Sequence, residues 1–384
     1  MFHFTAPLPL TLYLHIPWCI RKCPYCDFNS YESQELPEKA YVSALIADLE
    51  QDLLKVDTRQ IHSIFIGGGT PSLFSPLSIN EILTAICAHF HLVPHAEVTL
   101  EANPGTIDRP RLKDFYQAGI NRLSLGIQSL DEDVLRHLGR IHNRQEALKA
   151  MEDAKSVGFD NFNLDLMFGS PSQTLRSALE DLKTVASFQP VHLSWYQCTI
   201  EPNTMFGHCP PELPEEDSIL DMQIKGEAYL LNQGYLHYEV SAYAQPSWQC
   251  QHNLNYWQFG DYLGIGAGAH GKLTDIISGT VTRLSKQRHP LTYLRQAHTP
   301  HVIATRKVLQ PHEICLEFMM NSLRLDKGFT IQQFKNFTGL PSDMIHSPLQ
   351  EAYAKHWLIQ ENERIYATPL GMNFLNEVLE LFLS

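Results

Sequence analysis

Three cysteines in one short stretch are the strongest chemical feature of the sequence. Cys19, Cys23 and Cys26 lie in the string CIRKCPYC, directly after a short apolar run. Structural zinc sites usually take four ligands, and no partner pair of cysteines or histidines lies nearby. Iron–sulfur clusters are held by cysteine thiolates, and three thiolates on a four-iron cluster leave one iron open. The spacing therefore favours such a cluster over zinc, and the neighbouring Arg21 and Lys22 would favour the thiolate forms.

A glycine-rich turn, GGGTPS over Gly67–Ser72, follows the next apolar run. Successive glycines let the backbone approach a ligand closely and can expose N–H and C=O groups to a charged head group. The pattern is neither a phosphate loop nor a dinucleotide fingerprint. By itself it is also compatible with a plain tight turn.

Polar residues also lie at the ends of later apolar runs. Glu101 in LEANPG and Asp165 in NLDLMFG are carboxylates that could bind an ammonium group or a ribose hydroxyl, or could cap a helix. Gln128 in SLGIQS occupies a similar position, and Arg140 in LGRIH could form an ordinary surface ion pair. Five successive runs thus end in residues able to do chemistry, which predicts one shared site.

The elements that must position these residues alternate between β-rich runs and amphipathic stretches with three- and four-residue spacing. This alternation predicts parallel strands joined by right-handed helical crossovers, with the site at the C-terminal ends of the strands. Six units suit an open, incomplete barrel better than an eight-fold one. The expected strands are Leu12–Ile16, Ser63–Ile66, Glu97–Glu101, Arg122–Ile127, Asn161–Met167 and His192–Gln197, and the expected helices are Glu38–Leu54, Ile79–Phe90, Arg109–Ala118, Glu146–Val157 and Leu175–Ser187.

The pattern changes after the sixth unit. A Pro-rich loop at Pro202–Pro214 leads to a predicted long helix, Glu215–Asn232, and the chain then becomes rich in Tyr, Trp, Gly and His. We expect three domains: a partial (β/α)6 barrel over residues 1–200, an extension over 201–300, and a small winged-helix-like α+β domain over 301–384. The last domain is predicted from helices Glu313–Leu323, Ile331–Thr338 and Asp343–His356, strands Trp357–Gln360 and Arg364–Ala367, and a final helix from Leu370.

Composition restricts the class of protein. The 384 residues carry a formal charge of −13 without a basic run, so a nucleic-acid partner is not expected, and packing or docking is favoured for the last domain. Pro, His and charged residues interrupt every apolar stretch, which predicts no membrane span. The start lacks the charged head of a signal peptide, and a cytoplasmic location follows. The remaining cysteines are scattered, as expected for incidental thiols rather than a disulfide framework.

YLHIP at Tyr13–Pro17, leading into CIRKCPYC, and GGGTP after the second strand resemble the radical S-adenosylmethionine (SAM) superfamily. That resemblance implies a [4Fe-4S] cluster on Cys19, Cys23 and Cys26 whose open iron chelates SAM, and reductive cleavage of SAM to a 5′-deoxyadenosyl radical. Over nearly the whole chain the sequence is similar to the oxygen-independent coproporphyrinogen III oxidase-like branch. The SAM-binding positions implied by the resemblance are Tyr13, Gly68, Gly69, Thr70, Glu101, Gln128, Arg140 and Asp165.

Some of those positions bind a second SAM in the oxidase. Gln128, Arg140 and Asp165 could therefore be retained parts of the fold that do not bind SAM in this protein. By the same analogy the glycine-rich string LGIGAGAHG, Leu263–Gly271, would close over SAM, with the backbone near His270 touching it.

QCQHNLNYW, Gln249–Trp257, looks like the HNxxYW signature of the HemW-type haem chaperones. An imidazole is a natural axial ligand for haem iron, and Tyr256 and Trp257 offer flat surfaces to a porphyrin, so His252 is the expected ligand. Three alternatives stay open. His252 could only hydrogen-bond a loop while the aromatic residues fill the core, and Cys250 could ligate the iron or bond a haem vinyl group.

Two features favour haem carriage over oxidation of coproporphyrinogen. Asp27 and Phe28 follow Cys26 where the oxidase has a further cysteine, and the oxidase's longer N-terminal arm is absent. The resemblance therefore implies a protein that binds a [4Fe-4S] cluster, SAM and haem and delivers haem to acceptor proteins such as respiratory enzymes. It also implies a cytosolic electron donor, and a homodimer is compatible with it. The alternatives are coproporphyrinogen III oxidation and an interaction module with a purely structural cluster.

Overall fold

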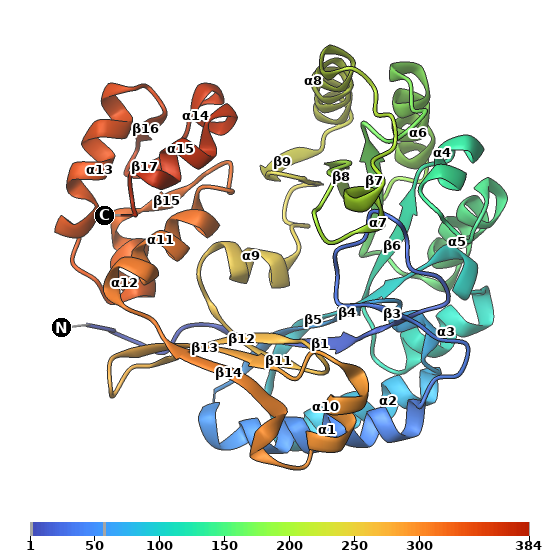
Figure 1. The fold of residues 1–384 in the computed structure, drawn as a ribbon, viewed down its shortest axis with the longest axis horizontal. Helices are drawn as coiled ribbons and strands as arrows, with labels where there is room; N and C mark the ends of the chain where they lie inside the picture. Colours follow the sequence, from blue (N-terminus) through green and yellow to red (C-terminus); the bar gives the residue numbers. More distant parts are fainter. Residues whose placement is uncertain (1–2, 57–58, 384) are drawn as a thin grey trace.

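A mixed sheet of 12 strands forms the centre of the molecule (Figure 1). The computed structural model describes residues 3–56 and 59–383. The described ranges do not include residues 1, 2, 57, 58 and 384. The outer bounds of the expected first and last domains, at residues 1 and 384, therefore lie outside the described residues. Six parallel strands are consecutive neighbours in the sheet, as the alternation predicts. They are β1 (Leu10–Ile16), β4 (Ile61–Gly68), β5 (Leu92–Ala102), β6 (Arg122–Gln128), β7 (Phe162–Phe168) and β8 (His192–Gln197).

Helices run along the outside of the curved sheet (Figure 1), and the expected ones are present within a few residues of their predicted ends. Local capping explains where several begin and end. Asp108 caps the N-terminus of its helix, Asn143 and Glu146 form a capping box, and Gly158 ends that second helix in the left-handed conformation. The helices of this part are α1 (Glu38–Val56), α2 (Pro76–His89), α3 (Arg109–Gln117), α4 (Glu132–His137), α5 (Arg144–Val157) and α6 (Leu175–Ser187).

The segment after the sixth unit adds strands to both edges of the same sheet. β11 (Asp261–Ile265) pairs in parallel with β1, an additional parallel strand that the sequence pattern did not indicate. The expected boundary at residue 200 therefore lies within one continuous sheet. This sheet is open, because its edge strands β14 and β9 are not paired with each other. The other added strands are β9 (Leu236–Glu239), β10 (Ala242–Ala244), β12 (His270–Asp275), β13 (Thr280–Lys286) and β14 (Ile303–Val308).

Two helices of this segment matter for the interior. The predicted long helix is present as α8 (Glu216–Asn232), and it packs closely because Gly226 lies where a Cβ would approach Trp195 to within 1.5 Å. A short helix, α9 (Gln251–Trp257), contains the HNLNYW string and lies between the sheet and the C-terminal part (Figure 1). The sequence pattern did not indicate this helix.

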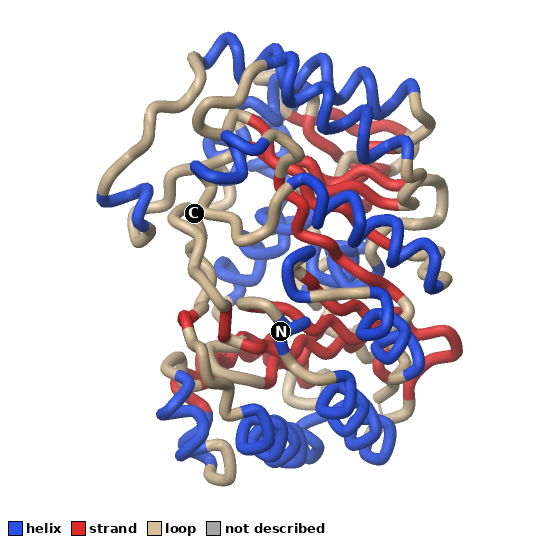
Figure 2. Tube along the Cα trace, turned by 90° about the vertical axis from the view of Figure 1, so that its right-hand side faces the viewer, coloured by secondary structure: helices blue, strands red, loops and turns tan. Residues whose placement is uncertain are grey.

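The C-terminal part has the expected winged-helix-like arrangement of helices and a three-stranded sheet. Its core is built around Phe318 and Phe334, and two residues of the preceding segment, Phe259 and Val281, belong to the same cluster. Figure 2 shows the helices and strands of the whole chain from the side. The C-terminal elements are α11 (Pro311–Ser322), β15 (Phe329–Thr330), α12 (Ile331–Thr338), α13 (Asp343–Ala354), β16 (Leu358–Glu361), β17 (Arg364–Ala367), α14 (Pro369–Asn373) and α15 (Leu375–Glu380).

Among residues 3–56 and 59–383, no helix is both long and apolar enough to cross a membrane.

Candidate functional site

A cavity of about 440 Å³ lies at the C-terminal ends of the parallel strands. It brings together the predicted site residues of five strand ends, as expected from the parallel sheet. The predicted residues that line it are Cys19, Cys23, Cys26, Gly68, Gly69, Thr70, Glu101, Gln128, Arg140 and Asp165. Tyr13 and His252, which were also predicted, do not line this cavity.

The cysteine loop is held at both ends by a small parallel pair, β2 (Trp18–Cys19) and β3 (Tyr31–Glu32). Inside the loop the Cys26 N–H donates to the Cys23 carbonyl over 3.1 Å, and the Thr70 hydroxyl lies 3.5 Å from Cys19 Sγ. In the part of the chain that the structure describes, no three His, Cys, Asp or Glu side chains are grouped to hold a metal ion. The three thiols therefore share a cavity wall and do not form a preassembled site for a single ion.

One half-buried cation, Arg140, dominates the electrostatics around the thiols. Arg140 Nη1 lies 3.6 Å from Cys23 Sγ, and although burial opposes it, Tyr25 and Cys23 raise the pKa of Arg140, which stays charged. Burial raises the pKa values of Cys19 and Cys26. Lys22 donates to the carbonyls of Phe28 and Ser30 and so shapes the loop, and its charge also lowers the pKa of Cys26 against the effect of burial, as expected of a residue that favours the thiolate.

The glycine turn packs against the strand that leads into the cysteine loop. Gly69 N–H donates to the Ile16 carbonyl and Thr70 N–H to the Trp18 carbonyl, each over 2.8 Å. A Cβ on Gly69 would lie 2.6 Å from the Trp18 oxygen, so only glycine fits. These two N–H groups therefore already have backbone partners, and binding of SAM by the turn stays a prediction. In the structure the turn positions the cysteine loop.

Two half-buried carboxyl groups face the cavity. Burial and the proximity of Asp165 raise the pKa of Glu101 to about 8, although its Oε2 accepts from Gly68 N–H over 3.1 Å. Burial also raises the pKa of Asp165, which accepts from Asn163 over 2.8 Å and from Ser124 over 3.1 Å. A ligand with positive charge or hydroxyl donors would relieve this repulsion between the two acids.

Gln128 and Arg140 also line the cavity. Gln128 adopts a left-handed φ of 67°, an unfavourable conformation of the kind found at functional sites, and its Oε1 accepts from Tyr196 over 2.6 Å. Arg140 Nη2 donates to the Gly126 carbonyl over 2.7 Å, and its Nε is buried without a partner among the described residues. Arg140 is therefore no surface ion pair, the alternative that its sequence context allowed.

Tyr13 lines a second, larger cavity of about 750 Å³, which shares Phe28, Gly68 and Glu101 with the first. Its hydroxyl hydrogen-bonds His15 Nδ1 over 3.0 Å. The LGIGAGAHG segment borders this second cavity, and Asn29, in the loop after the cysteines, donates to the Ala267 carbonyl over 2.9 Å. The structure thus places Tyr13 and this segment beside the cysteine cavity, on the far side of Glu101.

His252 is buried, at 1% exposure, and both of its ring nitrogens already have partners. Nδ1 lies 2.9 Å from Ser63 Oγ and Nε2 lies 2.8 Å from the Tyr256 hydroxyl, and burial lowers the pKa of His252 to about 3. Both ring nitrogens of His252 are therefore engaged in this structure, and its role as a haem ligand stays a prediction. Its observed role is the alternative one, a hydrogen bond that holds the local structure.

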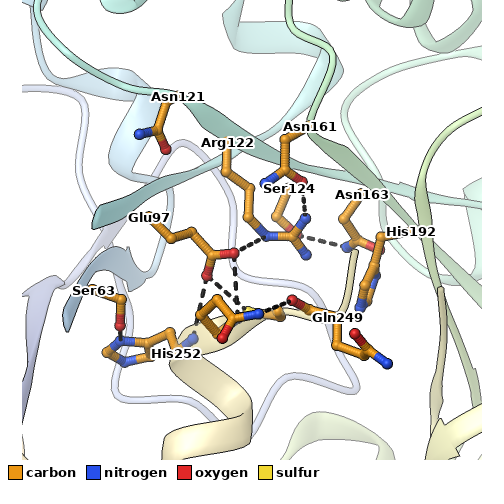
Figure 3. A network of polar contacts seen from close by, with 12 residues as sticks. Ser63, Glu97, Asn121, Arg122, Ser124, Asn161, Asn163, His192, Gln249 and His252 are labelled. Atoms are coloured by element: carbon orange, nitrogen blue, oxygen red, sulfur yellow. Dashed lines mark hydrogen bonds and ion pairs between the residues drawn. The ribbon is translucent and has the colours of Figure 1, made fainter. Parts of the chain in front are cut away.

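A buried polar network holds the start of α9 against the sheet (Figure 3). Glu97 accepts from the backbone N–H groups of Gln251 and His252, each over 3.2 Å, and pairs with Arg122 at 3.9 Å. Cys250 Sγ also lies 3.5 Å from Glu97, and burial raises the pKa of this thiol to about 12. These contacts do not test whether Cys250 ligates haem iron or bonds a haem vinyl group. A protonated thiol inside the network is nevertheless a poor metal ligand.

Sequence reasoning overlooked Glu97 and Arg122 because each was read as part of an apolar strand. The signal was present in the alternation along β5, since Glu97 and Glu101 lie four residues apart and therefore point to the same face of the strand. Two acids on one face of a strand inside a barrel require partners, and Arg122 begins the adjacent strand β6.

Comparisons with known proteins agree with this architecture. Residues 13–185 match the Radical SAM superfamily, and residues 309–374 match the HemN C-terminal domain. The structure superposes on coproporphyrinogen III oxidase (HemN) of Escherichia coli with a TM-score of 0.83 over 98% of this chain and 91% of that chain. Sequence identity between these two is 21%, so this similarity shows the shared fold.

Relatives at higher identity are similar over the whole length. The heme chaperone HemW of Haemophilus influenzae is 48% identical over 381 residues, and that of Escherichia coli is 46% identical over 377 residues, each over 98% of both chains. The heme chaperone HemW of Bacillus subtilis is 32% identical over 97% of this chain and 98% of the relative. The chain therefore belongs to the HemW family of radical SAM proteins.

Proposed function

We propose that this protein is a haem carrier that binds a [4Fe-4S] cluster, SAM and haem, and transfers haem to acceptor proteins. The central observation is the single cavity in which three cysteines, a glycine turn and the charged residues of successive strand ends meet. The names of the HemW relatives support haem as the cargo. We also propose a cytoplasmic setting with a cytosolic electron donor.

The residues around the thiols fit a cluster with three protein ligands. Cys19, Cys23 and Cys26 would each supply one thiolate, which leaves one iron for a small ligand. The Thr70 hydroxyl near Cys19 and the Arg140 guanidinium near Cys23 offer hydrogen bonds and positive charge to the sulfurs. Such neighbours stabilise an anionic cluster.

The residues at the other side of the cavity fit SAM. Its ammonium and ribose groups would satisfy Glu101 and Asp165, whose carboxyl pKa values are raised by burial and, for Glu101, also by the neighbouring Asp165. The unpartnered Nε of Arg140 and the side chain of Gln128 offer further polar contacts. When bound, the cluster and SAM supply one-electron chemistry, and this chain's residues would orient SAM and exclude water.

The test uses the full chain reconstituted anaerobically with iron and sulfide. We expect SAM to change the electron paramagnetic resonance spectrum of the reduced cluster, and we expect haem to bind with a Soret band and pass to an apo haem protein. Replacing Cys19, Cys23 or Cys26 with Ser should abolish the cluster, whereas Cys209→Ser, an exposed thiol, should not.

Two results would overturn the proposal. Failure of the reconstituted protein to bind haem would remove the carrier function. Conversion of coproporphyrinogen III to protoporphyrinogen IX would instead show the oxidase function that the same fold supports in HemN.

A further inference from the structure

A layer of polar side chains lies next to the first cavity, on the inner face of the sheet (Figure 3). Asn163 and Asp165 are two residues apart on β7 and therefore point to the same face of that strand. The parallel register places His192 of β8 beside Asn163, and Ser194 beside Asp165. Asp165 and Ser194 line the cavity, whereas Asn163 and His192 are buried, at 2% and 1% exposure. The buried pair therefore supports the pair that lines the cavity.

Asn163 holds the carboxyl group of Asp165 through its amide nitrogen. The Nδ2 group donates to Asp165 Oδ1 and to Ser124 Oγ, each over 2.8 Å. Ser124 Oγ in turn donates to Asp165 Oδ2 over 3.1 Å, so both oxygens of Asp165 accept from this layer. A reversed amide would turn its carbonyl oxygen toward the carboxylate, and the two acceptors would repel each other. The support of Asp165 therefore depends on the orientation of the Asn163 amide.

His192 fixes that orientation. Its Nδ1 lies 2.7 Å from Asn163 Oδ1, and Ser194 Oγ donates to the same oxygen over 3.1 Å. Burial and the nearby Arg122 lower the pKa of His192 well below its usual range, so the ring is neutral and has a single N–H group. Because an amide oxygen can only accept, this N–H must be at Nδ1. The other nitrogen, Nε2, then requires a donor.

The residues at the start of α9 complete the arrangement. The Tyr238 hydroxyl of β9 lies 2.8 Å from His192 Nε2, and it accepts the Cys250 N–H over 3.3 Å. Because the hydroxyl accepts from Cys250, its own proton is available to His192. A continuous series of hydrogen bonds thus runs from the start of α9 to the cavity. Its members, in order, are Cys250, Tyr238, His192, Asn163 and Asp165.

We propose that His192 is a positioning residue of the SAM site, which acts through Asn163 to hold the Asp165 carboxylate in the orientation that meets SAM. This inference rests on the proposed function, because it takes Asp165 as a contact of SAM. The alternative is that His192 only fills the interior of the sheet. The two differ in whether the effect of His192 on SAM affinity requires the carboxylate of Asp165.

The first test is a double-mutant cycle on SAM affinity. Equilibrium dialysis measures SAM binding to the anaerobically reconstituted full chain. Leucine has a similar volume and no polar atom, so we expect His192→Leu to bind SAM about threefold to tenfold more weakly, the effect of one lost hydrogen bond. In the Asp165→Asn background the same change should have no further effect, because the carboxylate through which His192 acts is gone. An equal loss in both backgrounds would overturn the proposal.

The second test is rescue by a conservative variant. His192→Asn keeps an N–H donor near the position of Nδ1 and should bind SAM within about twofold of wild type. The matched control is His237→Leu, the same change on β9, because the His237 ring stacks on Tyr243 and its Nε2 has no partner among the described residues. This control should keep the wild-type affinity for SAM.

Tyr238→Phe gives the same information if His192→Leu does not fold. It removes only the hydroxyl that donates to His192, so we expect SAM to bind about twofold to threefold more weakly, and without further effect in the Asp165→Asn background.

The outcomes separate this proposal from the proposed function. Wild-type protein that holds its cluster but binds no SAM would contradict the proposed function. If wild type binds SAM and His192→Leu binds it equally well, only the positioning role fails. Weak binding by His192→Leu that His192→Asn does not restore would also overturn the positioning role.

Discussion

At the residue scale, the chemistry open to each side chain depends on how many of its polar atoms already have partners. His252 and His270 are the same residue type, eighteen positions apart in the sequence, yet one is enclosed by Ser63 and Tyr256 while the other faces a cavity. Glu101 is enclosed as well, but its neighbours include another acid rather than a cation. Residues of one type therefore differ, according to their surroundings, in which polar atoms remain available.

The raised pKa of Glu101 predicts how the cluster-free protein responds to pH. A glutamate in the unfolded chain has a pKa of about 4.3, whereas Glu101 in the folded chain has a pKa of about 8. Between these two pH values the folded state therefore binds one more proton than the unfolded state. The stability that Glu101 contributes is lost as pH rises through this range. We expect the free energy of unfolding to fall from pH 5 to pH 8, and Glu101→Gln to reduce that fall by ~3 kcal/mol. Urea unfolding under reducing conditions measures both slopes.

Glu81→Gln, an exposed residue on α2, is the control for that experiment and should keep the wild-type slope. An identical slope in Glu101→Gln and wild type would show that Glu101 does not carry the extra proton.

His252→Ala tests the structural role of the enclosed imidazole. The change leaves Ser63 Oγ and the Tyr256 hydroxyl without a partner in the interior, so we expect a loss of about 2–3 kcal/mol in the free energy of unfolding. If the imidazole has this structural role alone, haem affinity should stay at the wild-type value. The shift of the urea midpoint at constant slope measures the first effect, and a haem titration measures the second. Unchanged stability with a lost Soret band would instead show that His252 is the ligand.

At the element scale, strand ends and their loops set the geometry of the site. The parallel register pairs His15 of β1 with Gly67 of β4, and this pairing brings the cysteine loop beside the glycine turn. The turn then follows the backbone of Trp18 so closely that side chains are excluded. Backbone contacts between neighbouring strand ends therefore position the thiols.

Gly69→Ala should displace the cysteine loop. The added Cβ would meet the Trp18 carbonyl at 2.6 Å, a backbone atom that cannot rotate away. We expect a loss of about 1–3 kcal/mol in stability and a large loss of cluster absorbance after reconstitution. Gly105→Ala is the matched control, because a Cβ there would make ordinary contacts of 3.4 Å or more. Full cluster content in Gly69→Ala would contradict this role of the turn.

At the scale of the whole molecule, the segment after the sixth unit joins the barrel to the C-terminal part. It adds strands to both edges of the sheet, contributes α9 to the interior, and supplies Phe259 to the C-terminal core. Phe259 packs on Phe318 with ring centroids 5.9 Å apart, and Lys272 Nζ lies 4.2 Å above its ring. Phe259 therefore anchors the segment after the sixth unit in the C-terminal core.

Phe259→Ala should loosen the attachment of the C-terminal part. Removing a buried phenylalanine costs about 3–5 kcal/mol, so we expect a lower unfolding midpoint and faster proteolysis within residues 309–383. Phe374→Ala, at a residue that is 42% exposed, should cost much less. Equal proteolysis rates for wild type and Phe259→Ala would show that other contacts hold the C-terminal part.

Much of the fold and of the first cavity follows from local sequence patterns. Helix and strand periodicity depends on neighbouring residues, so α6 and β8 begin and end where the pattern places them. Parallel strands collect their C-terminal ends at one edge, so Cys19, Glu101 and Asp165 could be assigned to one site before any coordinates.

Tertiary structure alone decided what depends on partners far away in the chain. Ser63 is 189 residues from His252 and Glu97 is 155 residues from it, so nothing near the HNLNYW string shows that its histidine is enclosed. The same holds for β11, which becomes a parallel strand only through its pairing with β1. The sequence by itself determined which residues could do chemistry and the strand ends on which they lie. Packing between distant segments determined which of their atoms remain free to do it.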